Sequence, residues 1–432
     1  MTKKYSILIA PSIFLFILPF THTVALRLSM LGIAFLTALY IWHKEEHPPI
    51  PLKLPLILTA LISAASIYWA VDPEYSFGEV KNEIGYTFLA FFTFFILTKS
   101  DKELRVFGGA LLAGATVMIG LGLGTYLIDG QWNVTGYQGG EHDFCIYVVF
   151  MIPMLVFTCF YIQRLWFRLL IISLMITLVI TGYFTLQRIM WPGIAVALLT
   201  VSLLLIYASS LRKTTKLASS TLVLFIGLTI LPIGFIAKNN TSYSSLGDVY
   251  KIIKIDPRVD GIWEAGVQGI EQAPLFGVGY GRRSFYKAYP ELKVDMGWHT
   301  HNIVLDKTVQ TGISGAILFV FLIGSIVNQF WCKFRASPKH EVMVLSVCCI
   351  ALVLAMLTVN MTNHAFVRHS ALLFWSLIGM SLGYCLRQES RAKKDAIAIA
   401  MAHQSEEKIL KNKNSLESLP ESSQSEERRV KG

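Results

Sequence analysis

Long apolar stretches recur along almost the whole chain, and this feature most limits what it can fold into. A membrane-spanning helix needs about 20 mostly apolar residues. Twelve stretches approach that length, at about 5–21, 24–42, 53–70, 84–98, 105–128, 144–163, 166–184, 191–210, 217–237, 302–330, 341–361 and 371–387. Only 15% of the residues are charged, against about 25% in soluble proteins. A soluble enzyme, a disordered protein and a coiled coil are therefore excluded, and we expect an all-α polytopic membrane protein with about 12 transmembrane helices.

The spacing of these stretches predicts four regions. Residues 1–237 would hold transmembrane helices 1–9, and residues 301–387 helices 10–12. Between them, residues 238–300 form one large hydrophilic loop. Residues 388–432 are rich in charge and contain no aromatic residue, a composition typical of a solvated tail. We expect a short helix there followed by disorder, so that the tail is mostly disordered.

The distribution of lysine and arginine predicts how the chain is oriented. Cytoplasmic loops carry an excess of these residues. With the N-terminus inside, every connection on the cytoplasmic side is basic. The opposite connections near 71–83 and 129–143 are acidic, and Lys81 is the only lysine or arginine in them. Both termini are therefore expected in the cytoplasm and the large loop outside. The net charge of +10 is explained by these loops, and no nucleic-acid partner is expected.

The large loop is predicted to be partly helical. Asp256 and Pro257 form a helix-start signal, apolar residues then recur at helical spacing, and Pro274 ends the pattern. We therefore expect an amphipathic helix over 257–272. The three glycines between 277 and 281 resemble a dinucleotide-binding fingerprint, but that fingerprint requires a strand and a helix around it. A tight turn is the preferred interpretation.

Two arginines on the predicted outer side run against the charge rule. Arg188 lies between helices 7 and 8, and Arg258 lies in the first turn of the loop helix. The positive end of a helix dipole disfavours a cation, so a bound anion would satisfy both Arg258 and the helix. For Arg188 the alternative is contact with lipid phosphates. The pair Arg282 and Arg283 is interpreted as surface charge.

Two histidines stand at the boundary between the loop and helix 10. His299 and His301 could be interfacial rings in the headgroup layer, or a neutral His301 could accept a proton. They could also form a metal pair, but no acidic or cysteine cluster completes such a site, so no metal is expected. For Asp306 and Lys307, just inside helix 10, we expect a structural role.

The segment that begins at His301 resembles the histidine motif of the bacterial O-antigen ligase family. His301-Asn302, nine residues, and Gly312-Ile313-Ser314-Gly315 follow the pattern of His, Asn or a similar residue, nine residues, Gly, two residues and a small residue. The segment that precedes this motif is similar to the domain that ligases share with O-antigen polymerases. The residues that carry this similarity are Arg258, Trp263 and Pro274-Leu275-x-Gly277-Val278-Gly279. The topology resembles this family along its whole length.

The resemblance implies a metal-independent glycosyltransferase of the GT-C-like class without a cofactor, located in the bacterial inner membrane with its loop in the periplasm. It would transfer O-antigen polysaccharide from undecaprenyl pyrophosphate to a sugar hydroxyl of the lipid A core, completing lipopolysaccharide among membrane lipids. His301 would act as the general base or orient the acceptor, and inversion would follow from direct attack. The residues expected to bind the pyrophosphate are Arg188 and Arg258, with further contacts from Asn302, Gln187, Trp263, Arg282 and His299.

Other functions remain open from the sequence. An O-antigen polymerase shares the donor but usually has two large periplasmic loops, whereas this chain has one. A ligase that attaches glycan to protein would use the same chemistry. The alternative from another class is a lipid or solute transporter, which often shows inverted repeats, and no similarity between the two halves is apparent.

Overall fold

The computed structural model describes residues 2–130, 141–183, 189–208, 218, 221, 258–290, 299–361, 366 and 368–417. Every regular element in these ranges is a helix, and they contain no strand. The prediction of an all-α chain is therefore confirmed for this part. Gln187, Arg188 and nearly all of the expected span at 217–237 lie outside it, and for Arg258 only the backbone is described.

The chain divides into two compact units, residues 1–385 and 386–432. The first unit contains most of the helices: α1 (Thr2–Ile17), α2 (Val24–Lys44), α3 (Lys53–Ala65), α4 (Pro73–Glu79), η1 (Val80–Gly85), α5 (Tyr86–Leu97), α6 (Asp101–Asp129), α7 (Glu141–Tyr161), α8 (Leu165–Tyr183), α9 (Met190–Tyr207), η3 (Arg258–Trp263), α13 (Glu264–Gln272), α14 (Ser284–Ala288), α15 (Ile303–Ala336) and α16 (His340–Asn360). Helix α17 (Arg368–Glu417) begins in the first unit and supplies the described part of the second.

Nine helical stretches of the described chain are long and apolar enough to cross a membrane. They are Val24–Lys44, Pro73–Leu97, Asp101–Ile128, Asp143–Tyr161, Leu165–Tyr183, Met190–Tyr207, Ile303–Ala336, His340–Asn360 and Arg368–Ile399. Two shorter apolar helices, Ile7–Ile17 and Lys53–Ala65, accompany them. The chain is thus a multi-pass membrane protein. The count of twelve spans, the orientation and the four-region division stay predictions.

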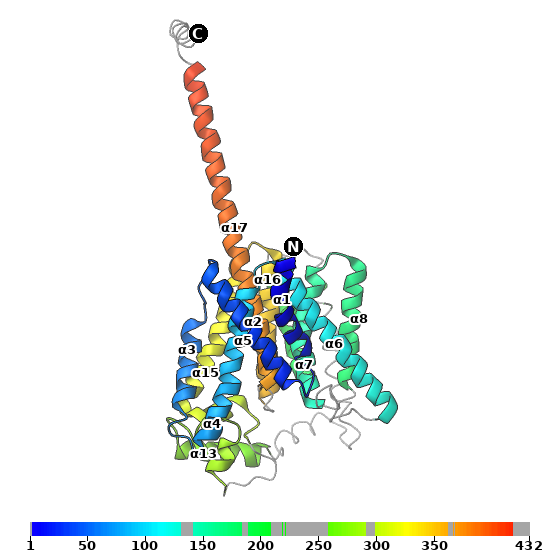
Figure 1. Cartoon of the computed structure of the whole chain (residues 1–432), viewed down its shortest axis with the longest axis vertical. Coiled ribbons are helices and arrows are strands. Elements are labelled where there is room, and N and C mark those ends of the chain that lie inside the picture. Colours follow the sequence, from blue (N-terminus) through cyan, green and yellow to red (C-terminus); the bar gives the residue numbers. More distant parts are fainter. Residues whose placement is uncertain are drawn as a thin grey trace. The chain divides into compact units, whose positions relative to one another are not determined.

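The helices of the first unit form a bundle whose two ends differ (Figure 1). The N-terminus lies at one end, and α13 lies across the other. Helix α16 packs against α7, α9 and α15, and 83% of its apolar window is buried, against 22% for α8. Helix α16 is therefore an inner helix of the bundle, and α8 presents its side chains outward, as a lipid-facing helix does.

The stretch 71–83 differs from the expected acidic connection, because most of it is helical. The Asp72 side chain accepts a hydrogen bond from the Tyr75 backbone N–H at 2.9 Å, and Pro73 occupies the first helical position. These are the start signals that the sequence analysis used at Asp256 and Pro257. Helix α4, the π-helical η1 and α5 follow without interruption, so Glu79 and Glu83 belong to a membrane helix.

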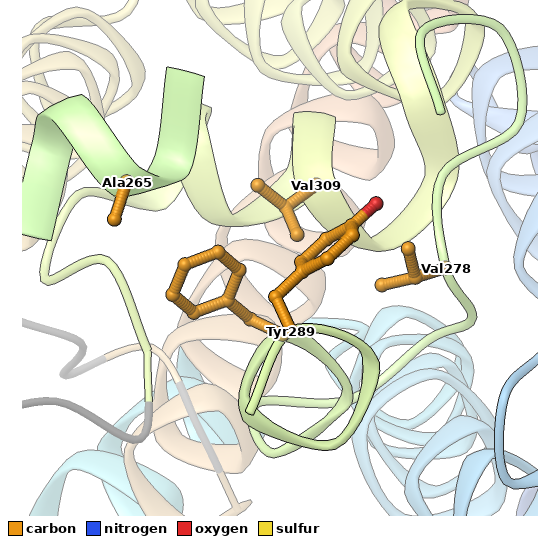
Figure 2. Close-up of a cluster of buried hydrophobic side chains, with 5 residues drawn as sticks. Ala265, Val278, Tyr289 and Val309 are labelled. Carbon is orange, nitrogen blue, oxygen red and sulfur yellow. The ribbon is translucent and has the colours of Figure 1, made fainter. Parts of the chain in front are cut away.

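The large loop is helical over 258–272, close to the predicted 257–272, and this part packs on the start of α15. Helix α13 ends at Gln272, two residues before Pro274. A small apolar core joins α13, α14 and α15, and Figure 2 shows Val278 and Val309 on either side of the Tyr289 ring. The Tyr289 hydroxyl donates to the Gly269 carbonyl at 3.0 Å. The loop helices are therefore fastened to α15 at the end of the bundle where the histidine motif begins.

Candidate functional site

A polar cavity of about 380 Å³ lies where α4 meets the segment before α14. Its lining comes from four segments that are far apart in sequence: α4, the stretch before α14, the connection before α15 and the first residue of α17. The lining residues are Tyr75, Glu79, Arg282, Arg283, His299, His301 and Arg368. We call this the histidine cavity. Arginines bind phosphate oxygens in a bidentate manner, and histidine exchanges protons near neutral pH, so this set is suited to an anionic ligand and a proton transfer.

The backbone around His301 is fixed by its neighbours. Thr300 donates to the Asp306 carboxylate twice, from its backbone N–H at 2.8 Å and from its hydroxyl at 2.7 Å. The Asn302 side chain accepts from the backbone N–H groups of Val304 and Leu305, at 3.0 and 3.2 Å, which caps α15. These contacts hold His301 on a short turn between two anchored residues.

His301 itself adopts a backbone conformation that side chains rarely take. Its φ is +55°, in the left-handed region, and strain of this kind clusters at functional sites. Its ring lies edge to face with that of His299, with 4.0 Å between the ring centroids. The sequence singled out both histidines, and the structure brings them together in one cavity.

The glycine of the histidine motif breaks α15. Gly312 has φ 71° and ψ −178° inside the helix, a combination that is essentially restricted to glycine. The break frees backbone groups, and the Ile313 N–H donates to the Pro274 carbonyl at 2.8 Å. A Cβ at Gly312 would lie 2.2 Å from the Leu275 carbonyl carbon. Because residue 312 has no side chain, another stretch of backbone can pack directly against the interrupted helix.

That stretch is the glycine-rich segment 274–281. The N–H groups of Val278 and Gly279 donate to the carbonyls of Val309 and Gln310, each at 3.0 Å. All three glycines of the segment have positive φ, and a Cβ at Gly279 would lie 2.4 Å from the Ala70 Cβ. The segment is therefore not only the tight turn we expected. It passes between α15 and the α3–α4 connection, and it ends at the arginine pair of the cavity.

Separate contacts place the cavity's arginines. The Arg283 backbone N–H donates to the Tyr75 hydroxyl at 3.0 Å, which ties the arginine pair to α4. Arg368 begins α17 with φ +44°. The next residue, His369, faces Asp143 of α7 at 3.4 Å, so the start of α17 is held against α7.

Two buried carboxyl groups lie on the helix that starts at Pro73, and one of them, Glu79, lines the cavity. Glu79 is 7% exposed and Glu83 is 5% exposed. They lie four residues apart on one helical stretch, so their side chains share a face of that helix. One oxygen of Glu79, Oε2, is buried without a hydrogen-bond partner among the described residues. Ionisable side chains at such positions in membrane helices are costly and mark functional sites.

A buried lysine supports this pair from α15. Lys307 Nζ lies 3.8 Å from Glu83 Oε2 and donates to the Tyr280 hydroxyl at 2.7 Å and to Gln310 Oε1 at 3.2 Å. Burial, followed by the negative charge of Glu83, holds the pKa of Tyr280 well above its ordinary value. Its hydroxyl therefore keeps its proton. This network joins the cavity to the broken helix.

The remaining predicted site residues lie elsewhere. Asn302 is used in the cap of α15. Trp263 ends η3, half-buried, and its indole N–H has no hydrogen-bond partner among the described residues. Arg258 begins the same π-helical turn. Gln187 and Arg188 lie outside the described residues.

The sequence analysis missed three cavity residues and interpreted a fourth, Arg283, as surface charge. Arg368 could have been found by the rule that drew attention to Arg188, since the predicted orientation places it on the outer side as well. Tyr75 and Glu79 were assigned to a connection because the Asp72-Pro73 start signal was not applied. No sequence pattern joins these residues to His301, because the fold alone brings them together.

Comparison with protein families finds a match for the segment that contains the histidine motif. Residues 145–320 match a family model described as O-antigen ligase. The match includes His301, Gly312, Gly315 and the cavity's arginine pair, whereas the other cavity residues from α4 and α17 lie outside it. No curated protein matches the chain. The family contains O-antigen ligases and related polymerases. The resemblance of this segment to the O-antigen ligase family is thus confirmed.

Proposed function

We propose that the protein transfers O-antigen polysaccharide from undecaprenyl pyrophosphate to a sugar hydroxyl of the lipid A core. The reaction would take place in the histidine cavity, at the periplasmic face of the bacterial inner membrane. The observation that carries this proposal is the gathering of His301 with three arginines in one cavity. A glycosyl transfer needs a base for a weak nucleophile and cations for a diphosphate leaving group, and this cavity offers both.

The bond changes assign a task to each side of the cavity. His301 accepts the proton of the acceptor hydroxyl, and the hydroxyl oxygen attacks the anomeric carbon of the glycan. The bond from that carbon to the pyrophosphate oxygen breaks on the opposite face, which inverts the configuration. The arginines stabilise the charge that develops on the diphosphate, in place of a divalent metal ion.

Glu79 lines the same cavity as His301 and offers it a partner for the proton. A protonated imidazole next to Glu79 is stabilised by a neighbouring carboxylate, and Glu79 Oε2 is an acceptor without a described partner. Glu79 therefore either holds the imidazolium or takes up the proton itself. The candidates for further contacts with the donor, beyond the cavity, remain Arg258, Arg188 and Trp263. Asn302 caps α15 and so holds the turn that carries His301.

The proposal is tested with purified protein in lipid vesicles, supplied with undecaprenyl-pyrophosphate glycan and lipid A core in the presence of EDTA. A single mobility shift of the core lipid on a gel is expected. General base catalysis contributes about 10²–10⁴-fold, so His301→Ala should lower turnover by at least about 100-fold. His340→Ala, at the exposed start of α16, is the matched control and should keep full activity.

Other products would point to other functions. Longer undecaprenyl-linked glycans with unmodified core lipid would identify a polymerase. Transfer that stops in EDTA and returns with a divalent ion would overturn the metal-independent mechanism. If the folded protein yields no product, the transporter becomes the better hypothesis, and uptake into vesicles is then the assay.

A further inference from the structure

A second cavity lies between α6, α7 and α8, with a volume of about 580 Å³. Most of its lining is apolar, with Leu112, Met154 and Phe157 among the side chains that form its walls. The connection between α7 and α8 lies at the end of the bundle that carries the N-terminus, opposite α13 (Figure 1). This groove is therefore separate from the histidine cavity, and none of the residues assigned to glycosyl transfer lines it.

Cations gather at one mouth of the groove. Arg105 at the start of α6 and Arg164 in the α7–α8 connection belong to the lining, and both are exposed. The Arg105 Nε–H donates to the Tyr161 hydroxyl at 3.1 Å, which directs the guanidinium across the mouth. The Arg168 Nε–H donates a hydrogen bond to the Ile162 carbonyl. This contact holds together the turn that carries Arg164.

One carboxylate near the mouth, that of Asp101, offsets part of the charge of Arg105. Asp101 Oδ1 accepts hydrogen bonds from two hydroxyls, that of Tyr161 at 3.1 Å and that of Tyr384 at 2.7 Å. The mouth of the groove thus presents two exposed guanidinium groups above an apolar channel. A ligand that matches both must carry an anionic group at one end and a hydrocarbon chain at the other.

We propose that this groove binds an anionic glycerophospholipid, with an acyl chain between α6 and α7 and its phosphate on Arg105 and Arg164. Basic pockets between membrane helices bind anionic lipid headgroups in this manner. By the distribution of lysine and arginine, the mouth faces the cytoplasmic leaflet, whereas glycosyl transfer is proposed for the other side. The occupant is therefore a membrane lipid and not the glycan donor.

The charge arm of the test uses the full chain in detergent with phosphatidylglycerol or phosphatidylcholine, and native mass spectrometry counts the retained lipids. Wild-type protein should retain phosphatidylglycerol in preference. Each basic side chain near an anionic lipid is worth about a fivefold change in affinity, so Arg105→Gln with Arg164→Gln should weaken phosphatidylglycerol binding about 25-fold. The matched control, Lys44→Gln with Arg335→Gln, removes two exposed cations outside the groove and should leave the preference unchanged.

The shape arm uses two glycines of the same helix. Gly109 lines the groove, Gly120 does not, both are exposed, and a Cβ at either position would meet no atom within 4 Å. Gly109→Leu should therefore fill the groove without a clash and displace the acyl chain, whereas Gly120→Leu should not. A photoreactive phosphatidylglycerol should label α6 and α7 in the Gly120→Leu protein and lose that labelling in Gly109→Leu.

Two results would overturn the proposal. One is equal retention of the two lipids by the wild-type protein, and the other is identical labelling of the two leucine variants. Glycosyl transfer is not measured in either arm, so failure of the proposed transferase activity would leave this test intact.

Discussion

The histidine cavity and the groove between α6, α7 and α8 are built in opposite ways. The groove between α6, α7 and α8 is lined mainly by continuous helices and apolar side chains. Hydropathy alone therefore predicts the helices that form its walls. The histidine cavity is lined by helix ends, connections and residues with unusual backbone angles. One is a gap between regular elements, whereas the other requires that regular elements be interrupted. The difference predicts where single substitutions are tolerated and where they are not.

The largest effect is expected at the break in α15. Gly312→Ala forces a side chain into a glycine-only conformation and onto the Leu275 backbone, which should destabilise the protein by about 3 kcal/mol or more. Gly324→Ala lies in the regular half of the same helix, where a Cβ would meet no atom within 4 Å, and should be neutral or stabilising. Thermal unfolding in detergent compares the two. Equal unfolding temperatures would show that the break does not depend on glycine.

The next effect concerns the buried network beneath the histidine cavity. Lys307→Met removes the cation that faces Glu83, and breaking a buried pair costs about 3–5 kcal/mol because a charge is left without a partner. The double variant Lys307→Met with Glu83→Leu removes both charges and should recover much of that loss. Unfolding temperatures of the single and double variants measure the difference. A double variant less stable than the single one would contradict an ion pair.

A smaller change is expected from an arginine of the cavity. Arg282→Lys keeps the charge but loses the planar fork that binds phosphate oxygens in pairs, so transfer activity should fall about tenfold, within the range for a hydrogen bond to a charged group. Arg335→Lys, at the end of α15 away from the cavity, should keep its rate. Kinetics at varied donor concentration separate weaker donor binding from slower transfer. Unchanged kinetics would exclude bidentate binding by Arg282.

The smallest effect is expected in the apolar core of the loop. Tyr289→Phe removes the hydrogen bond to the Gly269 carbonyl but keeps the ring that fills the core in Figure 2, so the cost should be about 1 kcal/mol. Tyr68→Phe, at a side chain that is 93% exposed, is the control. A loss of several kcal/mol in Tyr289→Phe would mean that the loop depends on this bond more than on its packing.

The sequence was most informative where one physical rule acts locally. Hydropathy predicted the membrane helices, and the Asp-Pro signal with a later proline predicted the loop helix. The spacing between His301 and Gly312 identified the family. The spacing did not reveal that Gly312 interrupts a helix, because the reason for its presence is the Leu275 backbone, which lies 37 residues earlier in the chain.

The rest of the site could not be read from spacing because tertiary contacts create it. Glu79 and Arg368 lie almost 300 residues apart, and each looks ordinary in its own segment. They meet His301 through hydrogen bonds and ion pairs between helices, such as those of Arg283 with Tyr75 and of His369 with Asp143. Arg188, which the sequence favoured for the donor diphosphate, remains a prediction.

Because α15 is interrupted at Gly312, its first turns form a short helical piece of fixed length. His301 stands at one end of this short helical piece, and the carbonyls of Val309 and Gln310 at the other end fix the segment that leads to Arg282. The number of residues in this helical piece therefore sets the distance between the proposed base and the proposed diphosphate site. One inserted residue there would turn His301 by about 100° relative to the arginines. The nine-residue interval between Asn302 and Gly312 therefore cannot change length without turning His301 away from the arginines.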